Sequence, residues 1–136
     1  MSEPMESRTI SVRVDRPIDE AYAFLSQPEN FPKWASGLCT SVEQVGGEWI
    51  AQTPTGPMKV RFAPPNGFGV LDHAVIPDDG VEIHVPMRIL PSGSGSEVAL
   101  TLYRQPGMTD EQFDEDAAWV KKDLETMKRV LQDAKV

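Results

Sequence analysis

The sequence predicts an α+β domain in which a curved antiparallel sheet of about six to seven strands wraps around one long C-terminal helix, with two short helices after the first strand. Two observations carry this prediction. Between Thr40 and Tyr103, apolar and polar residues alternate in short segments separated by Gly, Pro and Asn turn signals, which is typical of an antiparallel meander. From Thr109 onward, apolar residues recur every three or four positions, which indicates a long amphipathic helix. That helix needs an apolar surface to cover it, and the meander offers the largest one.

The N-terminal part predicts a strand and two short helices after a flexible tail at residues 1–7. Residues Thr9 to Val14 alternate between apolar and polar, which favours a half-buried strand. Pro17 fits the first turn of a helix because its φ is already helical, and Pro28 ends that helix. The segment from Glu29 to Trp34 predicts one further short helical turn.

The meander supplies most of the predicted strands. They cover residues 42–45, 48–53, 58–62, 69–76, 81–89 and 98–102. The hairpin signal Gly46-Gly47 separates the first two strands, and the Ser and Gly residues at 92–96 separate the last two. Pro86 has no amide donor for the ladder of strand 81–89, so we expect a bulge or a bend there.

The last element is the long helix itself. Thr109 and Gln112 have the spacing of a capping box at its start. Charged residues of both signs are interleaved along it and predict a solvated outer face. The apolar stripe that should pack on the sheet consists of Phe113, Ala117, Val120, Leu124, Met127, Leu131 and Ala134.

Two N-terminal segments carry a family resemblance. The first reads ISVRVDRPIDEAYAFL from Ile10 to Leu25, and the second reads PENFPKW from Pro28 to Trp34. A strand, a helix begun by a proline and a proline-containing turn that ends in tryptophan resemble the usual entry of the START-like superfamily. This superfamily, also called SRPBCC or helix-grip, includes bacterial polyketide cyclases and the birch pollen allergen type. The resemblance implies a helix-grip fold with a hydrophobic cavity. It implies no particular reaction, because members range from lipid carriers to cyclases, hydratases and interaction modules.

The composition is that of one globular domain spanning residues 1–136, with 40% hydrophobic and 25% charged residues. The formal net charge of −8 repels a phosphate backbone, so we expect no nucleic-acid partner. The N-terminus lacks the pattern of a signal peptide, and no apolar run is long enough for a membrane span. Together with the single cysteine, Cys39, these features favour a reduced, cytoplasmic protein without membrane insertion.

No motif indicates a cofactor or a metal. The chain contains neither GxSxG nor a P-loop, and no helix is expected after Gly67-Phe68-Gly69, which argues against a nucleotide fingerprint. His73 and His84 have no third group at a metal-ligand spacing. We therefore expect no cofactor, no metal site and a small apolar or aromatic molecule as the partner.

Charge predicts the direction of the side chains in the strand at 69–76, where both faces are apolar. Asp72 should avoid the interior, and on the outer face it could pair with Arg61. That register turns inward the side chains of Leu71, His73 and Val75. Alternation in the neighbouring strands predicts an outer polar patch of Arg61, Glu82, His84 and Arg88.

His73 is the candidate catalytic residue. An imidazole inside an apolar cavity could orient a ligand or act as general acid or base near neutral pH. The alternative is a histidine that is hydrogen-bonded in the core or near the rim. No carboxylate on the same face is evident beside it.

Aromatic residues are candidates for the cavity wall, with core packing as the alternative for each. Trp34 should lie near the cavity mouth, and Trp119 lies off the main stripe of the long helix, on the flank of Asp116 and Asp123. The predicted ligand-binding residues are Trp34, Trp49, Phe62, Leu71, His73, Val85, Leu100 and Trp119.

Three functions follow from these patterns. The leading hypothesis is a domain that binds a small, mostly apolar molecule, and it requires a cavity. The second is an enzyme of the cyclase or hydratase kind with His73 as acid or base, and it requires a second polar group within reach. The third is a protein-interaction module, and it requires a sizeable exposed apolar patch.

Overall fold

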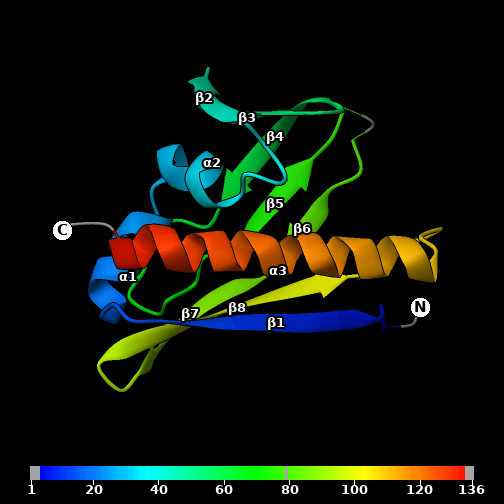
Figure 1. Ribbon diagram of the computed structural model, residues 1–136. Coiled ribbons are helices and arrows are strands. Elements are labelled where there is room, and N and C mark those ends of the chain that lie inside the picture. The colour runs from blue at the N-terminus through cyan, green and yellow to red at the C-terminus, as the bar shows by residue number, and fades with distance from the viewer. Residues whose placement is uncertain (1–3, 79, 134–136) are drawn as a thin grey trace.

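The structure, a computed structural model, describes residues 4–78 and 80–133. Figure 1 shows the long helix α3 (Asp110–Asp133) lying across two antiparallel sheets. One sheet has the order β1-β8-β7, with bounds Ser7–Val14, Gly95–Tyr103 and Met87–Ser92. The other has the order β2-β3-β4-β5-β6, with bounds Ser41–Val45, Glu48–Thr53, Gly56–Phe62, His73–Ile76 and Ile83–Val85. The predicted α+β architecture is thereby confirmed.

Three short helical segments lie beside the C-terminal half of α3 (Figure 1). They are α1 (Ile18–Leu25), the 3₁₀ turn η1 (Pro28–Asn30) and α2 (Phe31–Trp34). Strand β1 begins at Ser7, two residues earlier than predicted, and the Arg104 amide donates to the Glu6 carbonyl just before it. Of the tail expected at residues 1–7, residues 1–3 lie outside the described residues.

The described chain has eight strands because the predicted strand 81–89 divides at Pro86, as the missing amide suggested. β6 stays in the larger sheet and β7 joins the smaller one. The predicted strand 69–76 is also shorter, since its first residues pair with β7 instead. There Gly69 accepts from the Ile89 amide, and Leu71 donates to the Met87 carbonyl. This crossing couples the two sheets.

Asp72 fastens the bend after Pro86. Its carboxylate accepts hydrogen bonds from the Met87 amide at 2.9 Å and from Arg88 Nε and Nη2 at 3.0 and 2.9 Å. The predicted pairing of Asp72 with Arg61 is wrong: Arg61 pairs with Glu82. The reason is that β5 begins only at His73, so Asp72 lies beside the bend and not within the ladder that contains Arg61.

Helix α3 is held along its apolar stripe and at both ends. The predicted capping box is confirmed, with Thr109 N to Gln112 Oε1 at 2.9 Å and Gln112 N to Thr109 Oγ1 at 3.1 Å. At the other end, Arg16 Nε donates to the Leu131 carbonyl at 2.8 Å. The fully buried stripe residues are Phe113, Leu124, Met127 and Leu131, and Ala134 lies outside the described residues. Burying each such side chain contributes about 1.5–3 kcal/mol.

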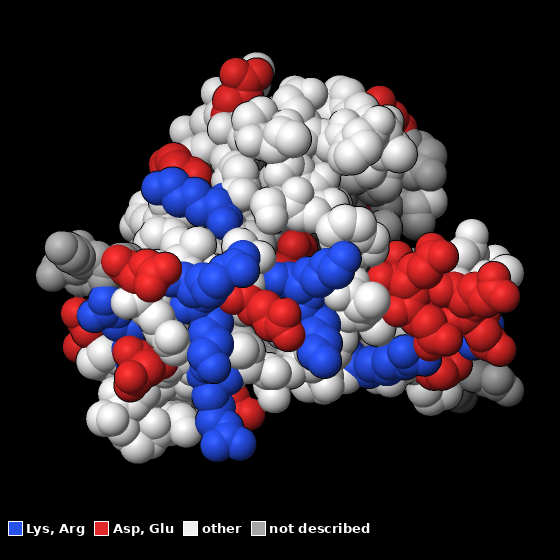
Figure 2. Space-filling model, in the orientation of Figure 1, with Lys and Arg blue, Asp and Glu red and all other residues white. Residues whose placement is uncertain are grey.

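The outer face of α3 is charged. Figure 2 shows acidic side chains gathered at its N-terminal end and basic ones nearer its middle. Asp110 and Glu111 lie in the first turn, where the helix dipole favours a negative charge. The surface above α3 in the same view carries few charges. Within the described parts of the chain, no helix has both the length and the apolar character needed to cross a membrane.

Candidate ligand-binding site

A cavity of about 280 Å³ lies between α3, α2 and the concave face of the sheets, and we call it the inner cavity. Its walls come from four parts of the fold, which are α2, the loop after α2, the sheets and α3. The cavity lies beyond the buried stripe of α3, where the helix and the curved sheet separate from each other. The lining residues are Phe31, Trp34, Ala35, Gly37, Leu38, His73, Val75, Val85, Leu100, Leu102, Asp116, Trp119, Val120 and Asp123.

His73 is the polar group of the sheet wall. Its side chain is 6% exposed, and its ring centroid lies 5.4 Å from that of Phe31 and 6.3 Å from that of Trp34. Nδ1 lies 3.2 Å from the Leu71 carbonyl oxygen. Since a carbonyl only accepts, the neutral ring carries its proton on Nδ1 and leaves Nε2 as an acceptor.

The second ring nitrogen, Nε2, is the acceptor of this tautomer. No hydrogen bond to it is found within residues 4–78 and 80–133, and no fully buried side-chain nitrogen or oxygen there lacks a partner. The His73 residue lines the inner cavity and also a second hollow beside Arg61 and His84. Burial lowers the pKa of His73 to about 4, and the imidazole is therefore neutral at pH 7.

The α3 wall brings two carboxylates to the cavity. Asp116 and Asp123 lie two turns apart on the same flank as Trp119. Asp123 Oδ1 accepts from the Gly37 amide at 3.1 Å. Burial raises the pKa of Asp123, and burial with the nearby Glu115 charge raises that of Asp116. No lysine or arginine is among the lining residues.

Gly37 sets how closely Trp119 approaches the loop after α2. A Cβ atom at Gly37 would lie 2.7 Å from Cε3 of Trp119, which is well inside van der Waals contact. The absence of a side chain at this position lets the indole lie against the loop at the cavity mouth. Trp119 itself is 52% exposed, so one side of its ring faces the solvent.

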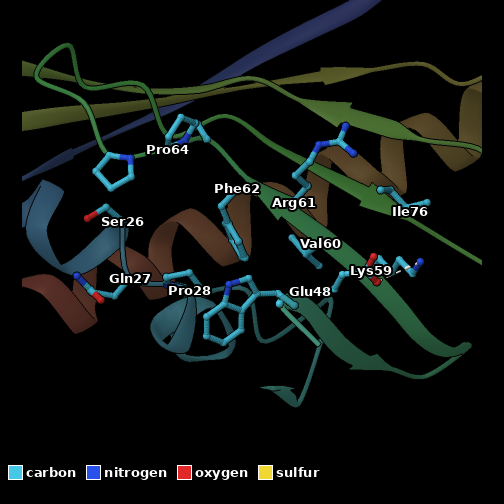
Figure 3. Close-up of a pocket in the computed structure, with 14 residues that line it drawn as sticks. Ser26, Gln27, Pro28, Glu48, Lys59, Val60, Arg61, Phe62, Pro64 and Ile76 are labelled. Carbon is cyan, nitrogen blue, oxygen red and sulfur yellow. Dashed lines mark ion pairs between the residues drawn. The ribbon is translucent and has the colours of Figure 1, made fainter. Parts of the chain in front are cut away.

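A second cavity, of about 580 Å³, opens where β4 extends past the end of β3, and we call it the outer cavity (Figure 3). In the figure, Phe62 and Pro28 lie together on one side, and Ser26 and Pro64 lie across the opening. Its cations are already paired: Lys59 Nζ lies 3.1 Å from Glu48 Oε2, and Arg61 pairs with Glu82. The outer cavity is larger than the inner one, and its charged lining residues, Glu48, Lys59 and Arg61, include both signs.

Known proteins are matched through structure and not through sequence. No model of a known protein family matches the chain, and no curated protein matches it either. Among solved structures, XoxI from Bacillus cereus has a TM-score of 0.75 at 12% identity, covering 95% of this chain and 97% of its own. Ara h 8.0201 has a TM-score of 0.68 at 10% identity, covering 96% and 100%. DynU16, a protein of the dynemicin biosynthetic locus, has a TM-score of 0.70 at 15% identity, covering 97% of this chain and 49% of its own.

The chain has the helix-grip fold. Identities this low show a shared fold and nothing more, so no residue role is carried over from these proteins.

The helix-grip architecture divides the predicted ligand-binding residues between two places. The inner cavity contains Trp34, His73, Val85, Leu100 and Trp119. The outer cavity contains Trp49 and Phe62. Leu71 lines neither of them: it is buried against the end of α1, beside Tyr22 and Leu25.

Several lining residues were not predicted. Phe31 and Leu38 belong to segments too short for a periodic signal, and Gly37 contributes through its lack of a side chain. The carboxylates of Asp116 and Asp123 share the flank of Trp119, and spacings of three and four residues along a helix are the signal that places them there.

Of the predicted outer polar patch, Arg61, Glu82 and His84 lie at the larger sheet, whereas Arg88 lies on β7 of the smaller sheet and pairs with Asp72. His84 is exposed opposite Ala74, and Arg61 lies on the other side of Ala74 in the same row. The exposed large apolar side chains come from separate elements and are Met5, Val45, Phe68, Val81, Leu90 and Trp119. In the described residues, no group of three or more His, Cys, Asp or Glu side chains is placed to hold a metal ion.

Proposed function

We propose that this protein is a START-like small-ligand-binding domain whose inner cavity holds a small, largely apolar or aromatic molecule. The observation that carries the proposal is a cavity between helix and sheet that is walled by apolar and aromatic side chains around one buried, neutral histidine. Apolar walls with few polar groups are typical of small-molecule sites, in which the polar groups fix the orientation of the ligand.

The size of the inner cavity limits the ligand. Its volume of about 280 Å³ lies near the lower end of the roughly 300–1,000 Å³ found for ligand cavities. Flat aromatic walls from Phe31, Trp34 and Trp119 suit a ring more than a flexible chain, because rings gain stacking or edge-to-face contacts with them. A molecule with one or two rings therefore fits the cavity better than a sterol does.

Structural neighbours support a role with small molecules, although they share only the fold. DynU16 belongs to the dynemicin biosynthetic locus, which is a setting in which a small molecule is made. The second predicted function, an enzyme of the cyclase or hydratase kind, has Asp116 and Asp123 as further polar groups at the same cavity. A His73 pKa of about 4 makes the imidazole a poor proton donor at pH 7, and this favours binding over acid catalysis.

The test is a thermal-shift screen against flavonoids, aromatic polyketides, fatty acids and sterols, followed by calorimetry on each hit. A ligand at about a hundred times its Kd should stabilise the fold by roughly 2.7 kcal/mol. Two matched substitutions determine which cavity binds the ligand. Leu102→Trp fills the inner cavity, and Ser26→Trp narrows the outer one. We expect Leu102→Trp to abolish binding and Ser26→Trp to preserve it.

Two results would contradict the proposal. One is a complete absence of stabilising ligands, and the other is binding that is lost in Ser26→Trp but kept in Leu102→Trp. Each variant is first shown to unfold cooperatively, so that a loss of binding is not a loss of folding. The enzyme alternative is checked by product analysis with each bound ligand in the wild type and in His73→Ala.

A further inference from the structure

We propose that the inner cavity selects a ligand bearing a positively charged amine on an aromatic or apolar body, and that it rejects carboxylate ligands such as fatty acids. This inference rests on the proposed function and specifies its ligand class. It comes from the hydrogen-bonding character and the charge of the groups that line the cavity.

The titratable groups at the inner cavity are all hydrogen-bond acceptors. They are the carboxylates of Asp116 and Asp123 on α3 and the imidazole of His73 on the sheet. The Nδ1 proton of His73 is engaged by the Leu71 carbonyl, which leaves Nε2 as the acceptor of a residue that lines the cavity. A ligand group that donates hydrogen bonds is therefore complementary to these three side chains, and one that only accepts is not.

Neither carboxylate is neutralised by the protein. Among the described residues, no lysine, arginine or histidine forms an ion pair with Asp116 or Asp123, whereas six other ion pairs form elsewhere in the same region. The Gly37 amide satisfies one oxygen of Asp123 and leaves its charge uncompensated. Two unpaired negative charges beside apolar walls attract a cation and repel an anion, more strongly than at an open surface.

His73 gives the second, independent indication of a ligand. His73 is 6% exposed, and its Nε2 atom has no hydrogen-bond partner within the described chain. A donor on a bound ligand gives Nε2 a hydrogen bond in largely apolar surroundings, where such a bond is stronger than in water. The cation and the donor can belong to one molecule, because a protonated amine carries both properties.

Aromatic side chains complete the complementarity. Trp119 lies between the two carboxylates along α3, and indole is the ring that binds cations best. Lys122 already lies over this ring, with Nζ 4.7 Å from its centroid, although Lys122 does not line the cavity. An ammonium group at the mouth would thus lie beside the carboxylates and beside a ring that already accepts the ammonium group of Lys122 on one face.

The test uses three probes that share one ring and differ in their polar end: 2-phenylethylamine, 2-phenylethanol and 3-phenylpropionate. Each is titrated into the full chain by isothermal calorimetry at low ionic strength. We expect the amine to bind at least about tenfold more tightly than the alcohol, and the acid to bind most weakly. Equal binding of amine and alcohol, or tighter binding of the acid, would overturn the inference.

Three substitutions locate the effect. Asp116→Asn and Asp123→Asn each remove one charge at the cavity, and at position 123 the asparagine oxygen can still accept from the Gly37 amide. We expect both to reduce the preference for the amine and to leave the alcohol affinity unchanged. Glu125→Gln removes the same charge from an exposed position of α3 outside the cavity, so it should leave the preference intact. An equal effect of Glu125→Gln would mean that the net charge of the protein attracts the amine, which contradicts the inference.

Failure of this inference is distinguishable from failure of the proposed function. If the wider screen finds ligands that depend on the inner cavity but shows no amine preference, only the inference fails. If neither the screen nor the three probes gives binding at the inner cavity, both fail.

Discussion

The rings of Phe31 and Phe62 meet edge to face with their centroids 5.3 Å apart, and each ring lines a different cavity of the domain. Phe31 lines the inner cavity and Phe62 lines the outer one. Both rings also contact the imidazole of His73, at 5.4 and 6.1 Å between centroids. The two cavities therefore approach each other at this pair of aromatic side chains.

Replacing Phe62 by alanine should join the two cavities. Because Phe62 is only half-buried, we expect the free energy of unfolding to fall by about 2–3 kcal/mol, less than for a fully buried phenylalanine. Urea denaturation measures this change. Larger ligands should then bind, since the space of the outer cavity becomes continuous with the inner one. The matched control is Phe68→Ala, because Phe68 is 86% exposed and its loss should cost less than about 0.5 kcal/mol.

His73 should make the stability depend on pH between about 4 and 6.5. Its pKa is lowered to about 4 in the folded protein, whereas the unfolded chain has the ordinary value of 6.5. As the pH falls through this window, the unfolded state takes up a proton that the folded state does not, so stability is lost. The loss is on the order of 3 kcal/mol and is complete near pH 4; above pH 6.5 the group has no effect.

The measurement is urea denaturation of the wild type and of His73→Leu from pH 4 to pH 8. The carboxylates titrate alike in both proteins, so the difference between the two free energies of unfolding isolates His73. We expect the wild type to lose free energy of unfolding relative to His73→Leu as the pH falls below 6.5. His84→Gln, at the exposed histidine, is the control and should keep the wild-type profile. A parallel profile for His73→Leu would show that the imidazole is not buried as described.

Asp72→Asn should destabilise the bend that couples the sheets. The hydrogen bonds from Arg88 lower the pKa of Asp72 and outweigh its burial, so the charged carboxylate is the form that the fold favours. Because water reaches this side chain, we expect a loss of about 1–2 kcal/mol and not the full value for a buried pair. The contribution is present above the ordinary aspartate pKa and is lost as the pH falls below it. Glu82→Gln, at an exposed pair, should cost under about 1 kcal/mol in the same urea experiment.

Gly37→Ala should displace Trp119 and change the cavity mouth. The new methyl group would lie 2.7 Å from the indole, and the half-exposed ring is free to move away. We expect a change in tryptophan fluorescence and in ligand affinity, with a stability loss below about 1 kcal/mol. The control is Gly67→Ala, since nothing lies within 4 Å of a Cβ at Gly67. Unchanged fluorescence and affinity in Gly37→Ala would contradict the contact.

Cys39 should be chemically inert in the folded protein. The thiol is 1% exposed, and burial together with the nearby charge of Asp123 raises its pKa to about 11. Because the thiolate is the reactive form, Ellman's reagent should react only as fast as the protein unfolds. The reaction in denaturant gives the reference rate. A native rate close to that reference would show that the thiol is accessible.

The layout of the fold was predictable because it depends on local patterns. Alternation over a few residues gives the strands, a stripe at helical spacing gives α3, and the residues Thr109 and Gln112 define where it starts. The bend at Pro86 was predictable for the same reason, since a missing amide is a property of one residue. The partner of Asp72 was not, because the pairing of 69–71 with β7 depends on where two sheets cross.

By itself, the sequence determined which face each side chain takes: inward for His73 and Val75, outward for His84, and on the cavity flank of α3 for Trp119. Only the tertiary structure decided how far along the sheet each inward residue lies, and so it separated Trp49 and Phe62 from His73 and enclosed Leu71 elsewhere. The physical reason is that periodicity gives a direction, whereas a cavity is the space left between elements. That space depends on how a curved sheet and a crossing helix meet, which no segment of the chain encodes alone.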